Sequence, residues 1–457
     1  MARPTPLSGF PELLPQARLV EQHVLDVLRE VFELHGFSSI ETRAVEPLSV
    51  LLRKGEIDKE VYGVRRLAEG AAGGDGGSGD ELALHFDLTV PFARYVTENA
   101  GHLQFPFRRY QVQKVWRGER PQEGRYREFT QADIDVVDRG TLAVHHDADM
   151  ARVMGEALSR LPLPGVILQV NNRRLVEGFY RGLGLEGDVL TGSIGATMRA
   201  VDKLDKVGAR GVADLLTEAG LTQAQVDGAL GLAQVRAGAD DLVAAVRDLG
   251  VSHELLDQGL EELLAVLTAV DDLPADRVAV VADLSVARGL DYYTGTVYET
   301  RMRGWESLGS ICSGGRYDSL ADDGRDVYPG VGISLGVTRA IIPLLARGAV
   351  RASRPTPTAV VVAVADEAHR RDADRVANQL RARGVAVEVS PTAAKFGKQI
   401  RFADRRGVPF VWFPGLDAAD GHQVKDIRSG EQVPADPASW LPPAADLRPS
   451  VVAGDQA

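Results

Sequence analysis

The spacing of apolar residues predicts helices and strands in mixed order along the first part of the chain. Between Gln16 and Leu34 they recur every three or four positions, which predicts a helix, and Gly36 is suited to end it. Shorter alternating runs predict strands at residues 38–47, with a turn, and at residues 82–86, 109–116 and 129–137. A second helix is expected over residues 148–161.

Residues 175–273 differ from the preceding residues in amino-acid composition and in the spacing of their apolar positions. They are rich in Ala, Leu, Gly and charged residues at helical spacing and contain few aromatic residues, so we interpret them as a helical insertion. Strand-like sequence resumes at Val278 and at residues 296–300, and residues 328–342 predict a strand that leads into a helix. The insertion therefore divides one domain into residues 1–174 and 274–346.

The last part of the chain alternates between strands and helices. Residues 347–357 are polar and contain prolines, which is typical of a linker, and residues 358–433 predict a small α/β domain with some parallel strand pairing. Residues 434–457 are rich in Pro and Ala and are expected to form a frayed tail. The Gly-rich residues 67–80 predict a mobile loop.

Length and composition exclude several classes of protein. A chain of 457 residues suggests roughly three domains. No apolar run is long enough to span a membrane, and the N-terminus lacks the features of a secretory signal. Cys312 is the single cysteine, which excludes an internal disulfide or a cysteine-cluster metal site and fits a cytoplasmic location. With 52 basic and 64 acidic residues, the net charge of −12 excludes a general polyanion binder, so any nucleic acid must bind to a local basic surface.

The generic catalytic and metal-binding motifs are absent from this sequence or weakly supported by it. Neither a P-loop nor an H-E-x-x-H zinc motif is present. His145, His146, Asp147 and Asp149 are close in sequence, but adjacent histidines at a helix start are expected to point to different faces, so we predict an exposed helix N-terminus and no metal ligands. Residues 332–336 match the G-x-S-x-G serine elbow of hydrolases, which is a weak alternative in a chain with 48 glycines.

Four segments place arginines, glycines and tyrosines where an apolar core is not expected: residues 108–135, 287–295, 313–318 and 330–339. The first predicts an antiparallel hairpin with a long charged tip and is net positive between Arg108 and Glu128. Guanidinium groups bind phosphate oxygens through two parallel hydrogen bonds. Together the segments predict arginines that converge on a polyphosphate such as ATP, as nucleotidyl transfer requires.

These segments resemble the motifs of class II aminoacyl-tRNA synthetases, and specifically the histidyl-tRNA synthetase family, over about residues 8–430. Residues 108–135 resemble motif 2, RGLDYYTGTVYE (residues 288–299) resembles the histidine-specific signature, SGGRYD (residues 313–318) its glycine-rich partner, and GVGISLGVTR (residues 330–339) motif 3. The resemblance implies an α+β catalytic domain on a mainly antiparallel sheet, with a helical insertion, and a C-terminal α/β anticodon-binding domain.

The resemblance also implies roles for single residues. Arg117 and Arg288 would act catalytically at the α-phosphate and also contact histidine. The ATP-binding residues would be Arg117, Glu119 at the adenine amino group, Arg125, Arg288, and Arg339 at the γ-phosphate. The histidine pocket would be formed by Asp87 and Thr89 at the α-amino group, Gln131, Asp135 facing the imidazole, Tyr292, Tyr293 and Tyr317. The tRNA contacts would be Arg120 and Gln122 in motif 2 and Lys395, Lys398 and Arg401 in the basic segment 395–406.

One departure from the family pattern concerns magnesium. Class II motif 3 usually has a glutamate before its arginine, but here the residue before Arg339 is Thr338. Mg²⁺ would then be held mainly by the phosphates of ATP. The implied partners are tRNA(His), L-histidine and ATP, and the resemblance implies a homodimer with motif 1, residues 37–47, at its interface.

Two alternatives share the fold. One is a catalytically inactive relative, such as the regulatory subunit of ATP phosphoribosyltransferase, which is expected to lack the C-terminal domain and some ATP-binding arginines. The other is a synthetase for a different amino acid, which would share motifs 2 and 3 but not RGLDYY. The presence of Arg117, Arg288, Arg339 and the C-terminal domain favours a histidyl-tRNA synthetase.

Overall fold

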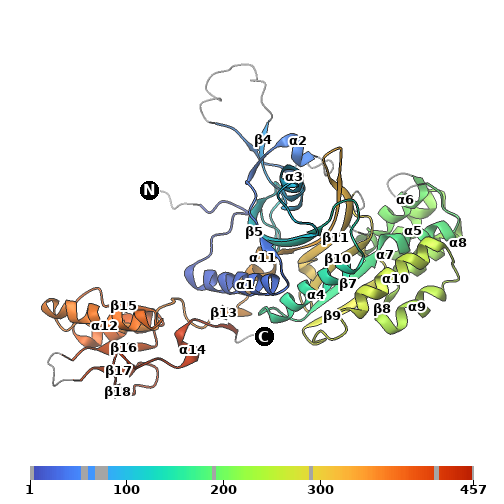
Figure 1. The fold of residues 1–457 in the computed structure, drawn as a ribbon. Helices are drawn as coiled ribbons and strands as arrows, with labels where there is room; N and C mark the ends of the chain where they lie inside the picture. The colour runs from blue at the N-terminus through green and yellow to red at the C-terminus, as the bar shows by residue number, and fades with distance from the viewer. Residues whose placement is uncertain are drawn as a thin grey trace. The chain divides into compact units, whose positions relative to one another are not determined.

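Figure 1 shows a computed structural model of the chain, which describes residues 5–52, 60–66, 81–187, 192–287, 292–415 and 421–454. The chain forms two compact units. The first comprises Met1–Pro11 and Val24–Pro343, and the second comprises Glu12–His23 and Leu344–Ala457. The Gly-rich residues 67–80, for which we expected a mobile loop, lie outside the described residues. No helix in the described part of the chain is long and apolar enough to cross a membrane.

The first unit is built on one large sheet of nine described strands in the order β1-β5-β6-β12-β11-β10-β7-β9-β8. The β1–β5 and β7–β9 pairs are parallel and the other neighbouring pairs are antiparallel, so the implied mainly antiparallel sheet is confirmed. The strands are β1 (Ser38–Ser39), β5 (Phe107–Trp116), β6 (Glu128–Val137), β7 (Val166–Asn172), β8 (Arg236–Ala237), β9 (Val278–Asp283), β10 (Thr296–Met302), β11 (Cys312–Asp322) and β12 (Val327–Gly336).

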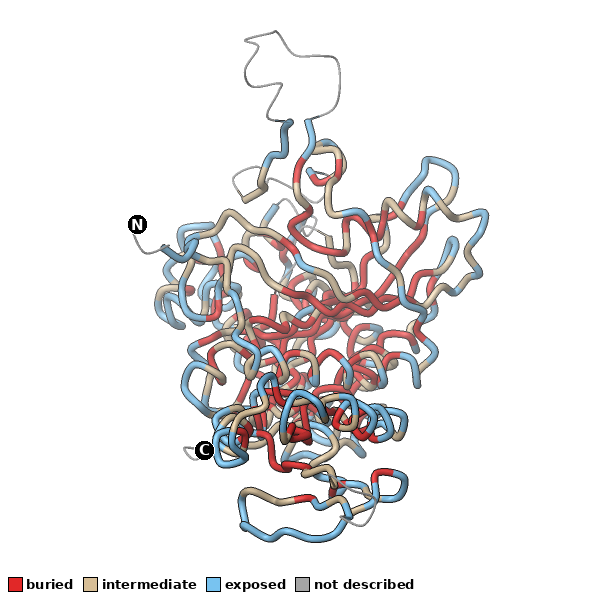
Figure 2. The backbone as a smooth tube through the Cα atoms, turned by 90° about the vertical axis from the view of Figure 1, so that its left-hand side faces the viewer, coloured by how far each residue is buried: buried red, intermediate tan, exposed pale blue. Residues whose placement is uncertain are grey.

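The two faces of this sheet have different chemistry. On β6, Ala132, Ile134 and Val136 point to one face, and the intervening Gln131, Asp133 and Asp135 point to the other, because side chains alternate along a strand. All six residues are buried, as are most residues of the central strands in Figure 2. A buried row of polar side chains indicates a site on that face.

Helices cover both faces of the sheet. Arg316 on β11 forms an ion pair with Asp147 on α4 (His145–Arg160), whereas the next residue, Tyr317, packs against Phe92 and Val96 of α3 (Thr89–Asn99). Successive residues of a strand face opposite ways, so α3 and α4 lie on opposite faces. Helix α4 begins three residues before the predicted start at Ala148.

The insertion is helical, as predicted, and it also adds a strand to the sheet. The helices are α5 (Arg173–Gly182), α6 (Gly192–Val201), α7 (Leu204–Glu218), α8 (Gln223–Ala233), α9 (Ala239–Arg247) and α10 (Glu254–Thr268). Between α8 and α9 the two residues of β8 pair with β9 and form an edge of the large sheet. We did not predict β8, since two residues show no alternation.

The remaining elements of the first unit are a small sheet and further helices. A three-stranded sheet in the order β2-β4-β3 consists of β2 (Val45–Pro47), β3 (Gly63–Val64) and β4 (Leu82–Leu84). The helices are α1 (Pro15–Leu34), which includes residues of both units, α2 (Leu48–Leu51) and α11 (Val337–Ala346). The predicted segment 38–47 therefore holds two strands, β1 and β2, that belong to different sheets.

The second unit contains a five-stranded sheet in the order β15-β14-β16-β17-β18, with β14 parallel to both β15 and β16, as predicted. Its elements are β14 (Val360–Val362), α12 (Arg370–Ala382), β15 (Val387–Val389), α13 (Phe396–Arg405), β16 (Phe410–Phe413), β17 (Gln423–Asp426) and β18 (Gln432–Pro434). The linker and the tail, which we expected to be irregular, each contain a short strand. Strand β13 (Val350–Ala352) of the linker pairs antiparallel with β19 (Val451–Ala453) of the tail, and the short helix α14 (Ala444–Leu447) comes before β19. Such pairing depends on residues about a hundred positions apart, which local patterns do not report.

Candidate active site

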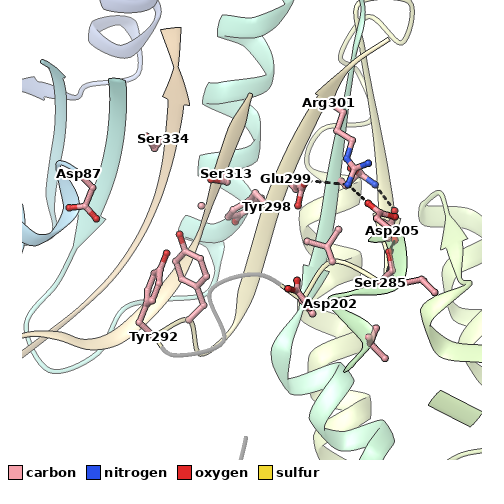
Figure 3. Close-up of a pocket in the computed structure, with 18 of the residues that line it drawn as sticks. Asp87, Asp202, Asp205, Ser285, Tyr292, Tyr298, Glu299, Arg301, Ser313 and Ser334 are labelled. Atoms are coloured by element: carbon pink, nitrogen blue, oxygen red, sulfur yellow. Dashed lines mark hydrogen bonds and ion pairs between the residues drawn. The ribbon is translucent and has the colours of Figure 1, made fainter. Parts of the chain in front are cut away.

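A cavity of about 770 Å³ opens on the polar face of the large sheet. Figure 3 shows that it extends from Asp87 and Ser334 to Asp205 and Arg301 beside the helical insertion. Its lining includes predicted site residues from three separate parts of the sequence: Asp87, Thr89, Arg117, Arg125, Gln131, Tyr292 and Tyr293. An adjoining cavity of about 210 Å³ shares Arg117, Arg125 and Gln131 and is also lined by Glu119 and Arg339.

A further cavity of about 20 Å³, which shares Thr89, Tyr293 and Ser334 with the largest one described above, is lined by a buried carboxylate, Asp135. Its Oδ1 accepts a hydrogen bond of 2.9 Å from the Tyr317 hydroxyl, and its Oδ2 lies 2.5 Å from Nη2 of Arg109. Arg109 is fully buried, with its guanidinium 4.2 Å from the centre of the Phe92 ring. Burial raises the pKa of Tyr317 well above its usual range, so its hydroxyl keeps its proton. Asp135 is therefore held in one orientation by two polar partners.

Two glycines of β12 leave the space that this pair occupies. A Cβ on Gly332 would lie 2.1 Å from Oδ1 of Asp135, and a Cβ on Gly330 would lie 2.5 Å from the Tyr317 ring. Real Cβ contacts do not come so close, so any larger residue at either position must displace Asp135 or Tyr317. The glycines of the motif 3 segment thus serve the pocket.

Ser334, the serine of the G-x-S-x-G match, is part of the same face. It lies within β12 rather than on a sharp turn, and its hydroxyl donates to Oδ1 of Asp133 over 2.5 Å while accepting a hydrogen bond from Nε2 of Gln131. The hydrolase interpretation is therefore wrong, because that mechanism needs an exposed serine at a strand-to-helix turn. Burial raises the pKa of Asp133 to about 7, although Arg109 and Ser334 act to lower it.

The rim of the pocket is formed by Asp87, Thr89 and the double tyrosine. Oδ1 of Asp87 accepts the backbone N–H of Val90 over 3.1 Å, at the N-terminus of α3, where the helix dipole favours a negative charge. Thr89 is the first residue of that helix. The ring centroids of Tyr292 and Tyr293 lie 4.2 Å apart, and burial raises the pKa of Tyr293 well above its usual range.

Arg117 stands where the two cavities meet. Its Nε donates to the carbonyl oxygen of Phe86 over 3.0 Å, and its guanidinium lies 5.1 Å from the ring centre of Phe129. Arg339 is held similarly at the smaller cavity, since its Nε and Nη2 donate to the carbonyl of Leu308 over 3.1 and 2.7 Å. These backbone bonds fix the direction in which each positive charge faces the cavity.

The predicted hairpin tip between β5 and β6 is present. Gln122 and Arg125 exchange two backbone hydrogen bonds, and Nη1 of Arg125 lies 3.5 Å from a carboxylate oxygen of Glu119. Arg120 and Gln122 are exposed on this tip. Arg288, to which the resemblance gives a catalytic role, lies outside the described residues.

Thr338, the departure from motif 3, is buried. Its hydroxyl accepts the backbone N–H of Thr130 over 2.8 Å and so joins the start of α11 to β6. Of the described residues that line the smaller cavity, Glu119 alone carries a carboxylate. The surroundings of Arg339 therefore do not provide the carboxylate cage that a resident divalent cation would need.

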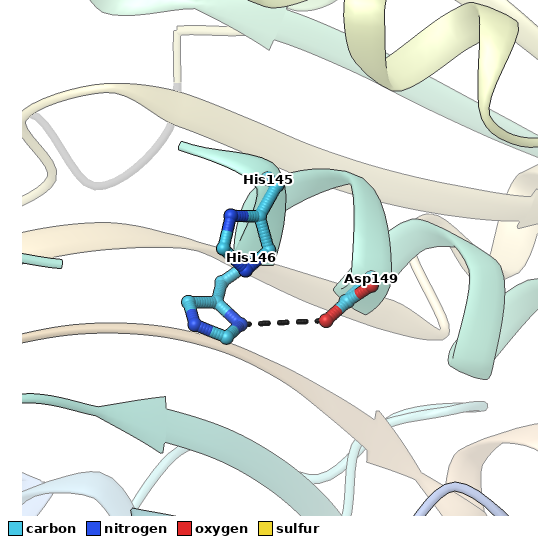
Figure 4. Close-up of side chains that lie close together, drawn as sticks. All are labelled: His145, His146 and Asp149. Atoms are coloured by element: carbon cyan, nitrogen blue, oxygen red, sulfur yellow. Dashed lines mark hydrogen bonds and ion pairs between the residues drawn. The ribbon is translucent and has the colours of Figure 1, made fainter. Parts of the chain in front are cut away.

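The histidine cluster differs from its prediction. His145 and His146 do not diverge: their ring centroids are 4.1 Å apart, and a ligating atom of each lies within 4.8 Å of the others in a group completed by Asp149 (Figure 4). The pair lies in the first turn of α4, where we had expected different faces. Nη1 of Arg108 lies 3.0 Å from Oδ2 of Asp149, so a guanidinium already neutralises this carboxylate.

In the second unit, α13 presents an exposed basic surface. Lys395 precedes the helix, and Lys398 and Arg401 lie on it, all exposed beside the partly exposed ring of Phe396. Gln399 faces inward and exchanges hydrogen bonds with the backbone of Val364. Helix α13 is therefore held to the domain by Gln399 on its inner side and exposes positive charges on its outer side.

Three residues of the site were not singled out from the sequence, namely Arg109, Phe129 and Asp133, and Ser334 was noted only as part of the hydrolase match. Arg109 belongs to the segment 108–135, whose arginines we expected to converge on a polyphosphate, yet it pairs with Asp135, while its neighbour Arg108 pairs with Asp149. The alternation of β5 contained the signal, since residues two apart on a strand share a face and those next to each other do not. The same rule would have placed Asp133 between Gln131 and Asp135.

Comparison with known proteins agrees with the geometry. Residues 9–340 match the family model described as histidyl-tRNA synthetase, and residues 358–439 match the anticodon binding domain. A histidine–tRNA ligase of Micrococcus luteus is 59% identical and one of Cutibacterium acnes is 57% identical, each alignment covering 99% of this chain and of the relative. The crystal structure of histidyl-tRNA synthetase from Nostoc sp. PCC 7120 superimposes with a TM-score of 0.82 at 36% identity, covering 95% of this chain and 97% of that one.

These matches cover both units and do not favour either alternative, a regulatory subunit or a synthetase for another amino acid. The fold is that of a class II synthetase, with a large, mainly antiparallel sheet and a C-terminal anticodon-binding domain. The chain belongs to the histidyl-tRNA synthetase family.

Proposed function

We propose that this chain activates L-histidine with ATP to form histidyl-adenylate and pyrophosphate, and then transfers histidine to the 3′ end of tRNA(His). The observation that best supports this is the Tyr317–Asp135–Arg109 group, in which a buried carboxylate and a hydroxyl line a cavity of about 20 Å³ that adjoins the one lined by Arg117. Imidazole offers two ring nitrogens, and buried polar partners reject side chains that leave them unpaired.

In this proposal histidine lies with its imidazole toward Asp135 and Tyr317, between the rings of Tyr292 and Tyr293 and the sheet. Its α-ammonium group faces Asp87, Thr89 and Gln131. Its carboxylate faces Arg117, with Arg288 as a second positive charge. The two ends of the substrate thus meet opposite charges, which orients the carboxylate oxygen for reaction.

ATP would occupy the smaller cavity. Arg117 and Arg288 would contact the α-phosphate, and Arg339 the γ-phosphate. Glu119 would contact the adenine amino group, Arg125 would contact the nucleotide from the hairpin, and the Phe129 ring offers a flat surface for the base.

The histidine carboxylate oxygen attacks the α-phosphorus and pyrophosphate departs with the bonding electrons. Oriented guanidinium groups stabilise the charge that develops on the phosphate oxygens, and no protein nucleophile is needed. Mg²⁺ would enter with ATP, held mainly by its phosphates.

For the second step we propose that tRNA contacts both units. Arg120 and Gln122 on the hairpin tip would meet the acceptor end, whose terminal ribose hydroxyl attacks the adenylate. Lys395, Lys398 and Arg401 would contact the anticodon region, where exposed charges position an RNA through its phosphates. We propose a cytoplasmic homodimer with residues 37–47 at its interface, and β1, an exposed edge strand within that segment, supports this.

We also propose the domain boundaries that the sequence predicts. The catalytic domain would comprise residues 1–174 and 274–346, the insertion residues 175–273, the linker residues 347–357, the anticodon-binding domain residues 358–433 and the tail residues 434–457. The start of α5 at Arg173 and the end of α10 at Thr268 support the limits of the insertion.

ATP–pyrophosphate exchange with each of the twenty amino acids tests the first step. Exchange with histidine alone is the expected result, and exchange with a different amino acid would overturn the proposed specificity. Absence of exchange despite histidine binding would overturn the proposed activation. Acylation of purified tRNA(His), but not of other tRNAs, then tests transfer.

A further inference from the structure

The side-chain amide of Gln131 has a hydrogen-bond partner at its nitrogen but no described donor at its oxygen. The side chain is 6% exposed and lines both cavities. Its Nε2 donates a hydrogen bond to Oγ of Ser334, whereas no described residue donates a hydrogen bond to its buried Oε1. A buried carbonyl oxygen without a donor is unfavourable, so this atom is suited to receive a donor from a ligand.

The neighbours of Gln131 decide which end of its amide faces the cavity. Ser334 has one hydroxyl hydrogen, which it donates to Oδ1 of Asp133. The serine oxygen can then only accept from Gln131, and the amide NH₂ group must point toward it. Asp133 also lies 3.5 Å from Nε2 of the same amide, which favours the NH₂ group on that side.

We propose that Asp133 and Ser334 are positioning residues that orient the Gln131 amide, so that its carbonyl oxygen accepts a hydrogen bond from the α-ammonium group of histidine. An ammonium group has three N–H donors. Asp87 and Thr89 would accept the other two, so the orientation of Gln131 completes the set. This inference rests on the proposed function, which places the α-ammonium group in this part of the cavity.

The register of the sheet makes the arrangement rigid. Ser334 on β12 is the partner of Asp133 on β6, and Gln131 lies two residues earlier on the same face of β6. Asp133 is 2% exposed, so water does not compete for its oxygens. If the amide turned over, its N–H groups would face the N–H groups of the substrate, and a lost acceptor of this kind weakens binding by roughly 10- to 100-fold.

Asp133→Asn is the informative variant because it keeps the size of the side chain. An asparagine NH₂ group can donate to Ser334, which releases the serine hydrogen toward Gln131 and reverses the chain of hydrogen bonds. Ser334→Ala, which removes the link altogether, is the second variant. Asp138→Asn is the matched control, since Asp138 lies just beyond β6 and accepts the backbone N–H of Arg139.

Calorimetric titration with two histidine analogues separates positioning from general damage. L-Histidinol keeps the imidazole and the α-amino group, and 3-(imidazol-4-yl)propan-1-ol lacks only the amino group. We expect Asp133→Asn to raise the Kd of histidinol roughly 10- to 100-fold, Ser334→Ala to raise it by a smaller factor, and neither to change the Kd of the deamino analogue. The Asp138→Asn control should bind both analogues as the unmodified protein does.

Two results would overturn the inference: an unchanged Kd for histidinol in both variants, or an equal loss of affinity for both analogues. Gln131→Ala distinguishes this failure from failure of the proposed function. If Gln131→Ala weakens histidinol binding and Asp133→Asn does not, only the positioning role fails. If Gln131→Ala leaves histidinol binding unchanged, the proposed placement of the α-ammonium group itself is wrong.

Discussion

The hydrogen bond from Tyr317 to Asp135 reaches across a whole strand. Tyr317 is on β11 and Asp135 is on β6, and the 2.9 Å contact passes over the intervening β12 at Gly330 and Gly332. Because the other carboxylate oxygen pairs with Arg109, the orientation of Asp135 is set before any substrate binds. Such preorganisation is what a selective pocket requires.

Tyr317→Phe should weaken histidine binding while the fold is retained. The substitution removes one hydroxyl from a buried, charged acceptor, which costs about 1.5–3 kcal/mol and corresponds to a rise in KM for histidine of roughly 10- to 150-fold. Pyrophosphate exchange measured against histidine and ATP separately checks this. An unchanged KM for histidine, or an equal rise for ATP, would remove Tyr317 from the imidazole pocket.

Gly332→Ala should disturb the same pocket by steric overlap, without removing a charge or a hydrogen-bonding group. The new Cβ would fall 2.1 Å from Oδ1 of Asp135, so the carboxylate must move, and overpacking of this kind costs about 1–3 kcal/mol of stability. We expect a raised KM for histidine together with a lower Tm. Gly101→Ala is the control, because a Cβ there meets no atom within 4 Å. Normal kinetics in Gly332→Ala would contradict the close approach.

Arg117→Lys tests whether a fixed guanidinium is needed and not only a positive charge. Lysine keeps the charge but cannot reproduce the planar fork or its bond to the Phe86 carbonyl. We expect kcat for pyrophosphate exchange to fall about 100- to 1000-fold, the loss typical of an electrostatic group at a transition state. Arg139→Lys, an exposed arginine, is the matched control. Near-normal exchange in Arg117→Lys would argue against its role at the α-phosphate.

Arg401→Ala should separate the two steps of the reaction. Arg401 is exposed on α13 in the second unit, so we expect unchanged pyrophosphate exchange and a higher KM for tRNA(His), with a reduced dependence of that KM on salt. Arg375→Ala on α12 removes a similarly exposed arginine that pairs with Asp372. If both variants lose tRNA affinity equally, net charge and not the α13 surface is responsible.

Histidinol binding should depend on pH through Asp133. The pKa of Asp133 is raised to about 7, chiefly by burial and also by Asp135 and Asp87, while Arg109 and Ser334 oppose the rise. Below that pH the carboxyl group gains a proton, can donate to Ser334, and reverses the hydrogen-bond chain as Asp133→Asn does. The Kd of histidinol is measured for the unmodified protein and for Asp133→Asn at each pH, and the ratio of these two values cancels the titration of histidinol itself. We expect the unmodified protein to bind histidinol more tightly than Asp133→Asn at pH 8, and this difference should become smaller at pH 6. A constant ratio would contradict this linkage.

The sequence predicted the large elements and the family, because long periodic segments and RGLDYY are strong signals. It also predicted that Asp87, Gln131 and Tyr293 would share a site, and the structure brings them to one cavity although they are far apart in the chain. Their roles remain predictions. The placement of Arg288 also remains a prediction, since it lies outside the described residues.

What the sequence did not reveal depends on contacts between distant strands. Two adjacent arginines, Arg108 and Arg109, look alike in sequence, but the sheet places one beside Asp149 and buries the other against Asp135. Strands β8, β13 and β19 have only two or three residues each, which is too short to show a period. Ser334 matched a hydrolase motif because the sequence alone does not distinguish a glycine that leaves space for a neighbouring side chain, as Gly332 does for Asp135, from a glycine that forms a sharp turn.

The pairing of β8 with β9 has a consequence for anyone who wishes to shorten this protein. Excision of the insertion would remove β8 and leave the backbone N–H and C=O groups of Ala282 and Asp283, at the end of β9, open on one edge of the large sheet. An open edge is a template for pairing with another chain and so promotes aggregation. A minimal catalytic core should therefore keep residues 236–237 on a short hairpin, or place a lysine or proline on β9 to block that edge.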